Sequence, residues 1–277
     1  MTEIFNGRGF AQKKLEILGA KVAKIKKKGI VPKLVSIIVG ENPVGLFYAN
    51  LKKKTAEKIG VEVEIVTKPE NGERRRENQR AEELIKSIQK FNEDKTVHGI
   101  MLQLPLPDNF SPDEVWEILN CLSPKKDVDG LGENSDYSMP TVKAVLMIMR
   151  EAEKFTPLKV EPYKVLVVGH TGFEGGGVYT ALTEMGYVVD GANSQTNNLK
   201  QLTQNADILI SATGVPGLIK GDMVKEGVVI IDVGSPKGDF EKSVYEKASF
   251  VSPVPGGVGP VTVSCLLENL VNCASEQ

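Results

Sequence analysis

The sequence predicts an α/β protein with two domains, and three observations lead to this prediction. Strand-like apolar runs alternate with helical patterns along the chain, which is typical of parallel sheets with helices on their faces. The 277 residues exceed the usual size of one hydrophobic core, so two domains of roughly 100–150 residues each are expected. A strand-like run at 163–168 leads directly into a glycine-rich loop, which is how a Rossmann-like domain opens.

Apolar periodicity places the elements of the first half. Helices are expected at 10–28, 43–58, 78–91 and 111–119, and buried strands at 35–39, 61–66 and 100–104. The fourth helix begins Ser-Pro-Asp-Glu, with an N-cap serine and a proline at the first helical position. A turn at 126–132 and a helical pattern at 141–155 then lead into the second half.

The second half reads as a nucleotide-binding arrangement. After the glycine loop, further strands are expected at 187–189, 208–211, 228–232 and 250–252. In such a strand, loop, helix and strand order, the amides at the helix N-terminus receive a pyrophosphate. We expect Asp190 to end the second strand, where an acidic residue accepts the ribose hydroxyls of NAD.

Composition limits the classes of partner. The chain is 41% hydrophobic and 25% charged, with a formal net charge of −2, so neither nucleic acid nor an anionic membrane is an expected partner. Three cysteines without CxxC spacing and two histidines give no disulfide framework and no metal site. We find no signal peptide and no apolar span of about twenty residues, and therefore expect a cytoplasmic protein.

Three segments carry residues that suggest chemistry. The apolar run from Gly99 is interrupted by the amide of Gln103 and stopped by two prolines, and a buried amide needs partners. Tyr48 and Lys52 are spaced i, i+4, so they share one helix face. The third segment is Lys-Asp-Val-Asp-Gly at 126–130. Taken alone, each has an ordinary structural explanation: a capping amide, a solvated lysine face and a turn.

Together, in this order, the three segments resemble the bifunctional methylenetetrahydrofolate dehydrogenase/cyclohydrolase family. The resemblance runs nearly end to end and includes segments at 32–40, 97–99, 206–216, 231–234 and 253–262. It implies oxidation of 5,10-methylenetetrahydrofolate with a nicotinamide cofactor, followed by hydrolysis to 10-formyltetrahydrofolate, in one-carbon metabolism and purine biosynthesis. It also implies a homodimer formed through the nucleotide-binding domain.

The resemblance also assigns roles to residues and boundaries to domains. The catalytic group is Lys52, tuned by Gln103, with Tyr48 stacking near the pterin and Asp129, or its neighbour Asp127, binding the pterin edge. A wall at the domain cleft is expected from Pro255, Gly256 and Gly257. The expected cofactor-binding residues are Gly169, His170, Thr171, Gly175, Asp190, Ser194, Thr213, Gly214 and Val233. The expected domains are 1–139 with 258–277, whose last helix returns to the first domain, and 140–257.

The glycine loop departs from the family pattern. The family usually has Gly-Arg-Ser, whereas this chain has Gly169, His170 and Thr171, followed by Glu174 and, in place of a proline, Gly177. The family leads one to expect NADP as the cofactor. Because His170 replaces the arginine that would favour a 2′-phosphate, NAD is the alternative.

Three alternative functions account for parts of the sequence. A different two-domain nicotinamide oxidoreductase, such as a shikimate-dehydrogenase-like enzyme, does not account for the segments around Gln103 and 253–262. A cyclohydrolase with a weakened dehydrogenase activity is suggested by His170 and Glu174. A non-catalytic folate-binding protein is disfavoured by the intact Lys52.

Overall fold

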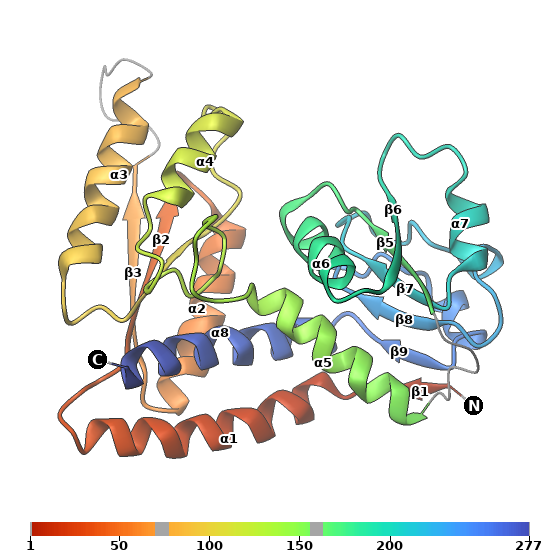
Figure 1. Cartoon of the computed structure of the whole chain (residues 1–277), viewed down its shortest axis with the longest axis horizontal. Coiled ribbons are helices and arrows are strands. Elements are labelled where there is room, and N and C mark those ends of the chain that lie inside the picture. Colours follow the sequence, from red (N-terminus) through yellow and green to blue (C-terminus); the bar gives the residue numbers. More distant parts are fainter. Residues whose placement is uncertain (1, 70–77, 156–162, 277) are drawn as a thin grey trace. The chain divides into compact units, whose positions relative to one another are not determined.

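The computed structural model describes residues 2–69, 78–155 and 163–276, and it divides the chain into two compact units (Figure 1). One contains a three-stranded sheet and consists of Lys13–Pro140 and Val263–Gln277; we call it the three-stranded unit. The other contains a six-stranded sheet and consists of Met1–Gln12 and Thr141–Thr262; we call it the six-stranded unit. Strand pairing in both sheets is parallel, so the predicted α/β class is confirmed.

The three-stranded unit has the strand order β3-β2-β4. Its elements are β2 (Lys33–Val39), α2 (Pro43–Lys58), β3 (Glu62–Lys68), α3 (Asn78–Glu93), β4 (Gly99–Leu102) and α4 (Pro112–Asn120). The long helices α1 (Gly7–Lys26) and α8 (Val258–Ser275) begin in the other unit and continue into this one, where Lys14 of α1 pairs with Glu268 of α8. Capping explains α4, because the Ser111 hydroxyl accepts from the Glu114 amide and the Glu114 carboxylate accepts from the Ser111 amide.

Alternation along the strands separates two cores. On one face, Val35, Ile37 and Ile100 pack with residues of α3 and α4. On the other face, Leu34 and Met101 pack with residues of α1 and α8. Because Gln103 is two residues after Met101, its side chain belongs to the second face. The expected strand at 100–104 ends earlier, at Leu102, but the Gln103 amide still donates to the Ile37 carbonyl at 2.8 Å and extends the ladder.

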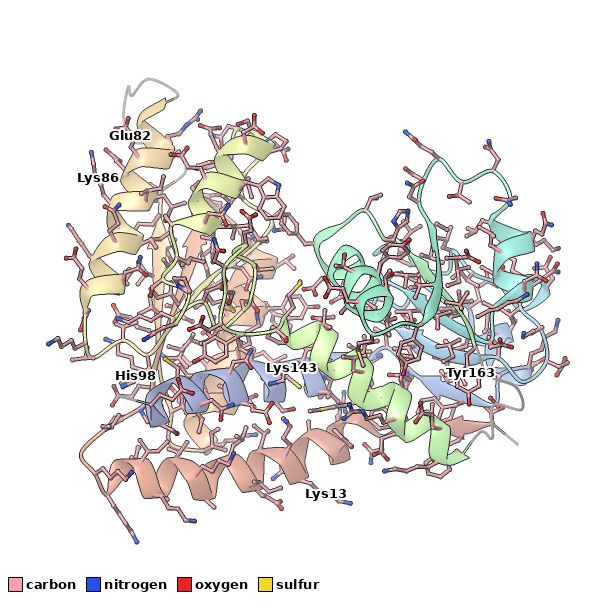
Figure 2. The ribbon with its side chains drawn as sticks, in the orientation of Figure 1. Lys13, Glu82, Lys86, His98, Lys143 and Tyr163 are labelled. Carbon is pink, nitrogen blue, oxygen red and sulfur yellow. The ribbon has the colours of Figure 1, made fainter. Side chains whose placement is uncertain are left out.

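The six-stranded unit has the strand order β1-β9-β8-β7-β5-β6. Its strands are β1 (Glu3–Ile4), β5 (Lys164–Val168), β6 (Val188–Ala192), β7 (Ile208–Ser211), β8 (Val229–Asp232) and β9 (Phe250–Ser252). Its helices are α5 (Pro140–Phe155), α6 (Phe173–Glu184) and α7 (Leu199–Asn205), with short 3₁₀ turns η1 (Gly221–Met223) and η2 (Lys242–Glu246). Figure 2 marks Tyr163 directly before β5. The central strands β7 and β8 are fully buried, as expected of a sheet covered on both faces.

The strand β6 is longer than the sequence pattern indicated. It continues to Ala192, so Asp190 lies within the strand, two residues before its end, and the prediction that Asp190 ends it is wrong. The physical reason is that β6 lies at the sheet edge, where outward residues such as Val188 and Asp190 are exposed. On an edge strand a charged residue does not mark the end of the pairing.

The partition of the chain differs from the expected domains at its first residues. The expected catalytic domain began at residue 1, but β1 pairs with β9, Glu3 opposite Phe250, and residues 1–12 group with the six-stranded unit. A two-residue strand produces no periodicity, which is why the sequence did not indicate it. None of the helices that the structure describes is long and apolar enough to cross a membrane.

Candidate active site

The helix α2 presents two of the predicted site residues. It begins after Asn42, whose side-chain oxygen accepts from the Gly45 amide at 2.7 Å, and Pro43 occupies the first turn. Tyr48 and Lys52 follow one turn apart, and both are partly buried. The Tyr48 ring meets the exposed Phe47 ring edge-on, with 5.5 Å between centroids and 78° between planes. Phe47 is not among the residues predicted for the site.

The ammonium group of Lys52 reaches across to β4. Its Nζ donates to Gln103 Oε1 at 3.5 Å and lies 3.3 Å from Met101 Sδ. The Gln103 amide nitrogen donates to the Leu104 carbonyl at 3.3 Å, which orients the amide with its oxygen toward the lysine. The structure therefore brings Lys52 and Gln103 together as predicted. The sequence did not suggest Met101 as a partner, because a methionine in a buried strand is typical of core.

Asp129 belongs to the same group of residues. The positive charge of Lys52 acts on this carboxyl group, so the two residues interact electrostatically. Burial raises the pKa of Asp129 above its ordinary value, and Lys52 opposes that rise. The preceding residue, Val128, is fully buried, and its carbonyl accepts from Asn269 Nδ2 of α8 at 2.9 Å. This anchor fixes the backbone beside Asp129.

Asp127 has a different environment. Its carboxylate is buried and accepts from the Gly130 amide at 3.1 Å and from the Gly132 amide at 2.8 Å. Burial raises its pKa to about 6, and these amide donors oppose the rise. Asp127 thus holds the turn that carries Asp129, with Gly130 at a positive φ of 65°. Of the two carboxylates proposed for the pterin, Asp127 is the one already engaged by the backbone.

Lys126 and His98 have structural partners. The Lys126 ammonium donates to the carbonyls of Phe91, Asn92 and Asp94 at 2.7–3.0 Å, so it caps the C-terminal end of α3. Burial lowers the pKa of Lys126. His98, labelled in Figure 2, is buried and its Nδ1 accepts from the Lys33 amide at 3.2 Å. Burial also lowers the pKa of His98, which favours the neutral ring.

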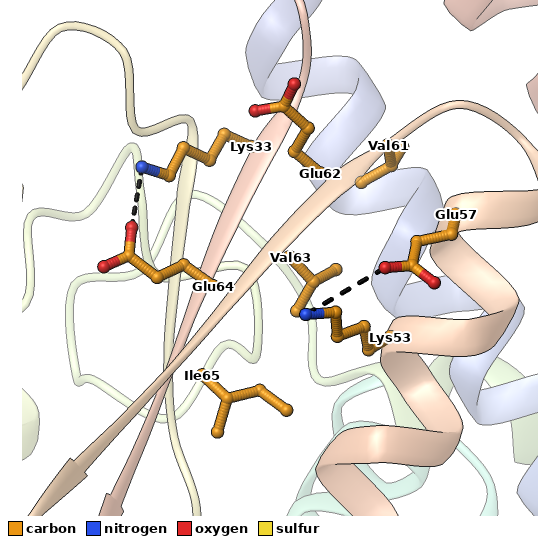
Figure 3. A pocket seen from close by; sticks show the side chains of 8 residues that line it. All are labelled: Lys33, Lys53, Glu57, Val61, Glu62, Val63, Glu64 and Ile65. Carbon is orange, nitrogen blue, oxygen red and sulfur yellow. Dashed lines mark ion pairs between the residues drawn. The ribbon is translucent and has the colours of Figure 1, made fainter.

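A hollow elsewhere in the three-stranded unit does not coincide with these residues. It lies between α2 and β3 (Figure 3), and its lining residues are Lys33, Lys53, Glu57, Val61, Glu62, Val63, Glu64 and Ile65. Within it Lys33 pairs with Glu64 at 2.7 Å, and Lys53 lies 4.0 Å from Glu57. Its lysines thus already face carboxylates, and none of the predicted catalytic residues lines it.

The glycine loop of the six-stranded unit fits a dinucleotide. Gly169, at a φ of 90°, follows β5, and Gly172 caps α6 without a side chain. A Cβ on Gly175 would lie 2.2 Å from the Gly169 carbonyl oxygen, so only glycine permits this contact of helix and loop. The start of α6, where dinucleotide-binding proteins place the pyrophosphate, follows this loop directly. His170 and Thr171 lie in this loop, as predicted.

The predicted residues Thr213 and Gly214 follow β7 and are held by an acid that sequence analysis missed. Asp239, which is fully buried, accepts from the Thr213 amide at 2.7 Å, from Thr213 Oγ1 at 2.8 Å and from Ser211 Oγ at 2.7 Å. Asp232, at the end of β8, accepts from the Gly234 amide at 2.9 Å and from the Asp239 amide at 3.2 Å. The two carboxylates thus order the loop after β7 and the loop after β8, which begins with the predicted residue Val233.

The predicted wall residues lie in the turn before α8. Gly256 has a φ of 106°, and Pro255 is exposed. A Cβ on Gly257 would lie 2.3 Å from Ser252 Oγ, so glycine is required there. Ser194, another predicted cofactor residue, is exposed two residues after the end of β6.

Comparison with known proteins identifies the family. The family model for the tetrahydrofolate dehydrogenase/cyclohydrolase catalytic domain matches residues 5–129, and that for its NAD(P)-binding domain matches residues 140–277. The chain belongs to the tetrahydrofolate dehydrogenase/cyclohydrolase family. The predicted family is therefore confirmed, and the three-stranded and six-stranded units correspond broadly to the family's catalytic and NAD(P)-binding domains.

Members of the tetrahydrofolate dehydrogenase/cyclohydrolase family match the whole chain. The bifunctional protein FolD of Halalkalibacterium halodurans is 37% identical over 291 residues, covering 99% of both chains. The crystal structure of the bifunctional FolD of Campylobacter jejuni superposes with a TM-score of 0.87 at 33% identity, covering 100% of this chain and 99% of that one. The Trypanosoma brucei methylenetetrahydrofolate dehydrogenase-cyclohydrolase, solved with NADP and an inhibitor, has a TM-score of 0.87 at 29% identity and covers 99% and 98%.

The shikimate-dehydrogenase-like alternative receives support for the fold only. A shikimate dehydrogenase of Aquifex aeolicus superposes with a TM-score of 0.54 at 16% identity. At this identity the likeness concerns the shared two-domain fold, whereas the tetrahydrofolate dehydrogenase/cyclohydrolase models match both domains of the chain.

Proposed function

We propose that this protein oxidises 5,10-methylenetetrahydrofolate to methenyltetrahydrofolate with NADP or NAD and hydrolyses the product to 10-formyltetrahydrofolate. The observation that carries the proposal is the position of Lys52, whose Nζ contacts Gln103 Oε1 and whose charge acts on Asp129, in a chain of this family. These groups combine a proton-transfer residue, a polar partner that positions it and a carboxyl group that can bind the pterin.

The oxidation depends on orientation of the folate. A bound nicotinamide accepts the hydride that leaves the bridging methylene carbon. Tyr48 provides an aromatic surface for the substrate rings, and Asp129 binds the amino and ring nitrogens of the pterin by charge-assisted hydrogen bonds. Pro255, Gly256 and Gly257 contribute backbone that a ligand can approach closely.

Lys52 acts in the hydrolysis. Water adds to the methenyl carbon, the carbon–nitrogen bond to N5 breaks, and one proton is released in forming the 10-formyl product. Lys52 Nζ has its position fixed by Gln103 and Met101, so we assign it the transfer of that proton. Gln103 is a positioning residue in this scheme.

The test follows the absorbance of methenyltetrahydrofolate with the purified chain. With NADP or NAD supplied, methenyltetrahydrofolate forms and is consumed in the wild type. Lys52→Met should lose hydrolysis by a factor of about 100 or more while keeping its fold, because the side chain lies at a partly open position. Unchanged hydrolysis by this variant would remove Lys52 from the catalytic role.

The same experiment separates the alternative function. A cyclohydrolase with a weakened dehydrogenase activity would hydrolyse added methenyltetrahydrofolate at the usual rate but would form little of it from the methylene substrate with either nucleotide. Failure of both reactions would contradict the proposed function as a whole.

We also infer that the enzyme is a cytoplasmic homodimer that pairs through its nucleotide-binding domain. The support is the free edge of β6, where Val188 is 49% exposed. An exposed strand edge with an apolar residue favours pairing with another chain.

A further inference from the structure

The elements around the Gly169 loop have an uneven charge distribution. Between Lys164 and Lys200 the sequence contains no lysine or arginine, while it contains Glu174, Glu184 and Asp190. Lys164 is the first residue of β5, so it lies at the end of the strand opposite to the loop. Lys200 Nζ lies 2.5 Å from Asp222 Oδ2, in an ion pair. Neither of these flanking lysines is therefore an unpaired cation at the loop.

His170 is the loop side chain that lies over β6. A Cβ on Gly191 would lie 2.7 Å from Cγ and Cδ2 of His170 and 3.0 Å from its Nδ1, so the imidazole covers the strand at this glycine. On its other side the ring is 5.2 Å from the ring centroid of Tyr179 on α6. Two elements thus hold the imidazole beside the carboxyl end of the second strand, where a dinucleotide places its adenosine ribose.

The turn after β6 is neutral. Asn193 Oδ1 accepts from the Gln195 amide at 3.0 Å, and Thr196 Oγ1 accepts from the Asn193 amide at 3.0 Å. Asp190 is adjacent to Gly191 in the strand, so its side chain points to the opposite face from the imidazole. The groups gathered at the strand end are therefore amides, hydroxyls and an imidazole.

We propose that this site binds the adenosine ribose without a fixed cation for a 2′-phosphate, so that the chain binds NAD no more weakly than NADP. A 2′-phosphate needs arginine or lysine partners for tight binding, whereas neutral amides and hydroxyls satisfy a ribose hydroxyl. The inference rests on the proposed function, since it concerns the nucleotide of that reaction, and it makes His170 and Gln195 specificity-determining residues.

Binding of the reduced nucleotides tests the inference without turnover. NADH and NADPH are titrated into the full-length protein near neutral pH, and the increase in nicotinamide fluorescence gives each dissociation constant. We expect the two constants to agree within about threefold, or to favour NADH. NADPH binding that is tighter by more than this factor would overturn the inference and leave the proposed function intact. Absence of binding by both nucleotides would contradict the proposed function itself.

Matched variants locate the determinant. Gln195→Lys adds a cation in the exposed turn and should tighten NADPH binding about tenfold relative to NADH binding. Gln201→Lys, the same change at an exposed position within α7, should alter neither constant. His170→Arg should act like Gln195→Lys, provided that the larger side chain fits over Gly191. If neither Gln195→Lys nor a folded His170→Arg strengthens NADPH binding selectively, the ribose lies elsewhere and the inference is wrong.

Discussion

The carboxylates of Asp127 and Asp129, two residues apart, have distinct environments. Asp127 accepts two backbone amides of its own turn, whereas Asp129 is influenced by Lys52. We predict that Asp129→Asn weakens tetrahydrofolate binding about tenfold, or about 1.4 kcal/mol, since it removes a charge-assisted acceptor. Calorimetric titration with tetrahydrofolate measures the loss.

Asp127→Asn is the matched control. We expect it to lower the free energy of unfolding, because one buried amide donor loses its acceptor or meets the new NH₂ group. A result in which Asp127→Asn loses affinity at unchanged stability, while Asp129→Asn binds normally, would reverse the two roles.

Asp232 makes stability depend on pH. Burial raises its pKa from 3.8 to about 6, with the nearby Asp239 adding to the rise. The folded state therefore binds this proton more tightly than the unfolded state. The protonated carboxyl group stabilises the folded state at low pH, and this stabilisation is lost as the pH rises through about 6. We predict that, as the pH rises from ~4.5 to ~7.5, the free energy of unfolding of Asp232→Asn increases by about 2 kcal/mol relative to that of the wild type.

Urea unfolding of both proteins across that range gives the difference. The comparison with the variant is necessary because His98, whose pKa is lowered by burial, changes stability with pH in the opposite direction. If the difference in the free energy of unfolding between variant and wild type did not vary with pH, the raised pKa of Asp232 would be contradicted.

One lysine caps the C-terminal end of the helix α3. Lys126 donates to three part-buried carbonyls there, so Lys126→Met would leave them without this donor. We predict a loss of roughly 2 kcal/mol in the free energy of unfolding, measured by circular dichroism in urea. Lys125→Met, at an exposed neighbour, should change it by less than about 0.5 kcal/mol. Equal effects of both substitutions would exclude the capping role.

Elements with strong periodicity could be predicted from the sequence, and elements without it could not. The spacing of Tyr48 and Lys52 placed both on α2, and the apolar run before Gln103 placed it after a buried strand. The end of β6 could not be predicted, because an edge strand tolerates the charge of Asp190. Asp239 was missed because its partner Ser211 is 28 residues away along the chain; only tertiary structure brings the two together.

The inferred homodimer can be tested by the mass of the protein in solution. We predict that light scattering at micromolar concentration gives twice the mass of one chain. Val188→Lys places a charge on the free edge of β6, where it should favour the monomer. Ile17→Lys, at a similarly exposed apolar position of α1, is the control and should leave the mass unchanged. A monomeric wild type would contradict the inferred dimer.

The pairing of β1 with β9 has a consequence for synthesis on the ribosome. Glu3 leaves the exit tunnel long before its partner Phe250 is translated, so the six-stranded sheet stays incomplete for most of elongation. The core of the other unit likewise waits for Leu266, Leu267 and Leu270 of α8. The six-stranded sheet therefore cannot close before β9 has left the tunnel, nor the other core before α8 has, so the nascent chain exposes apolar surface until then.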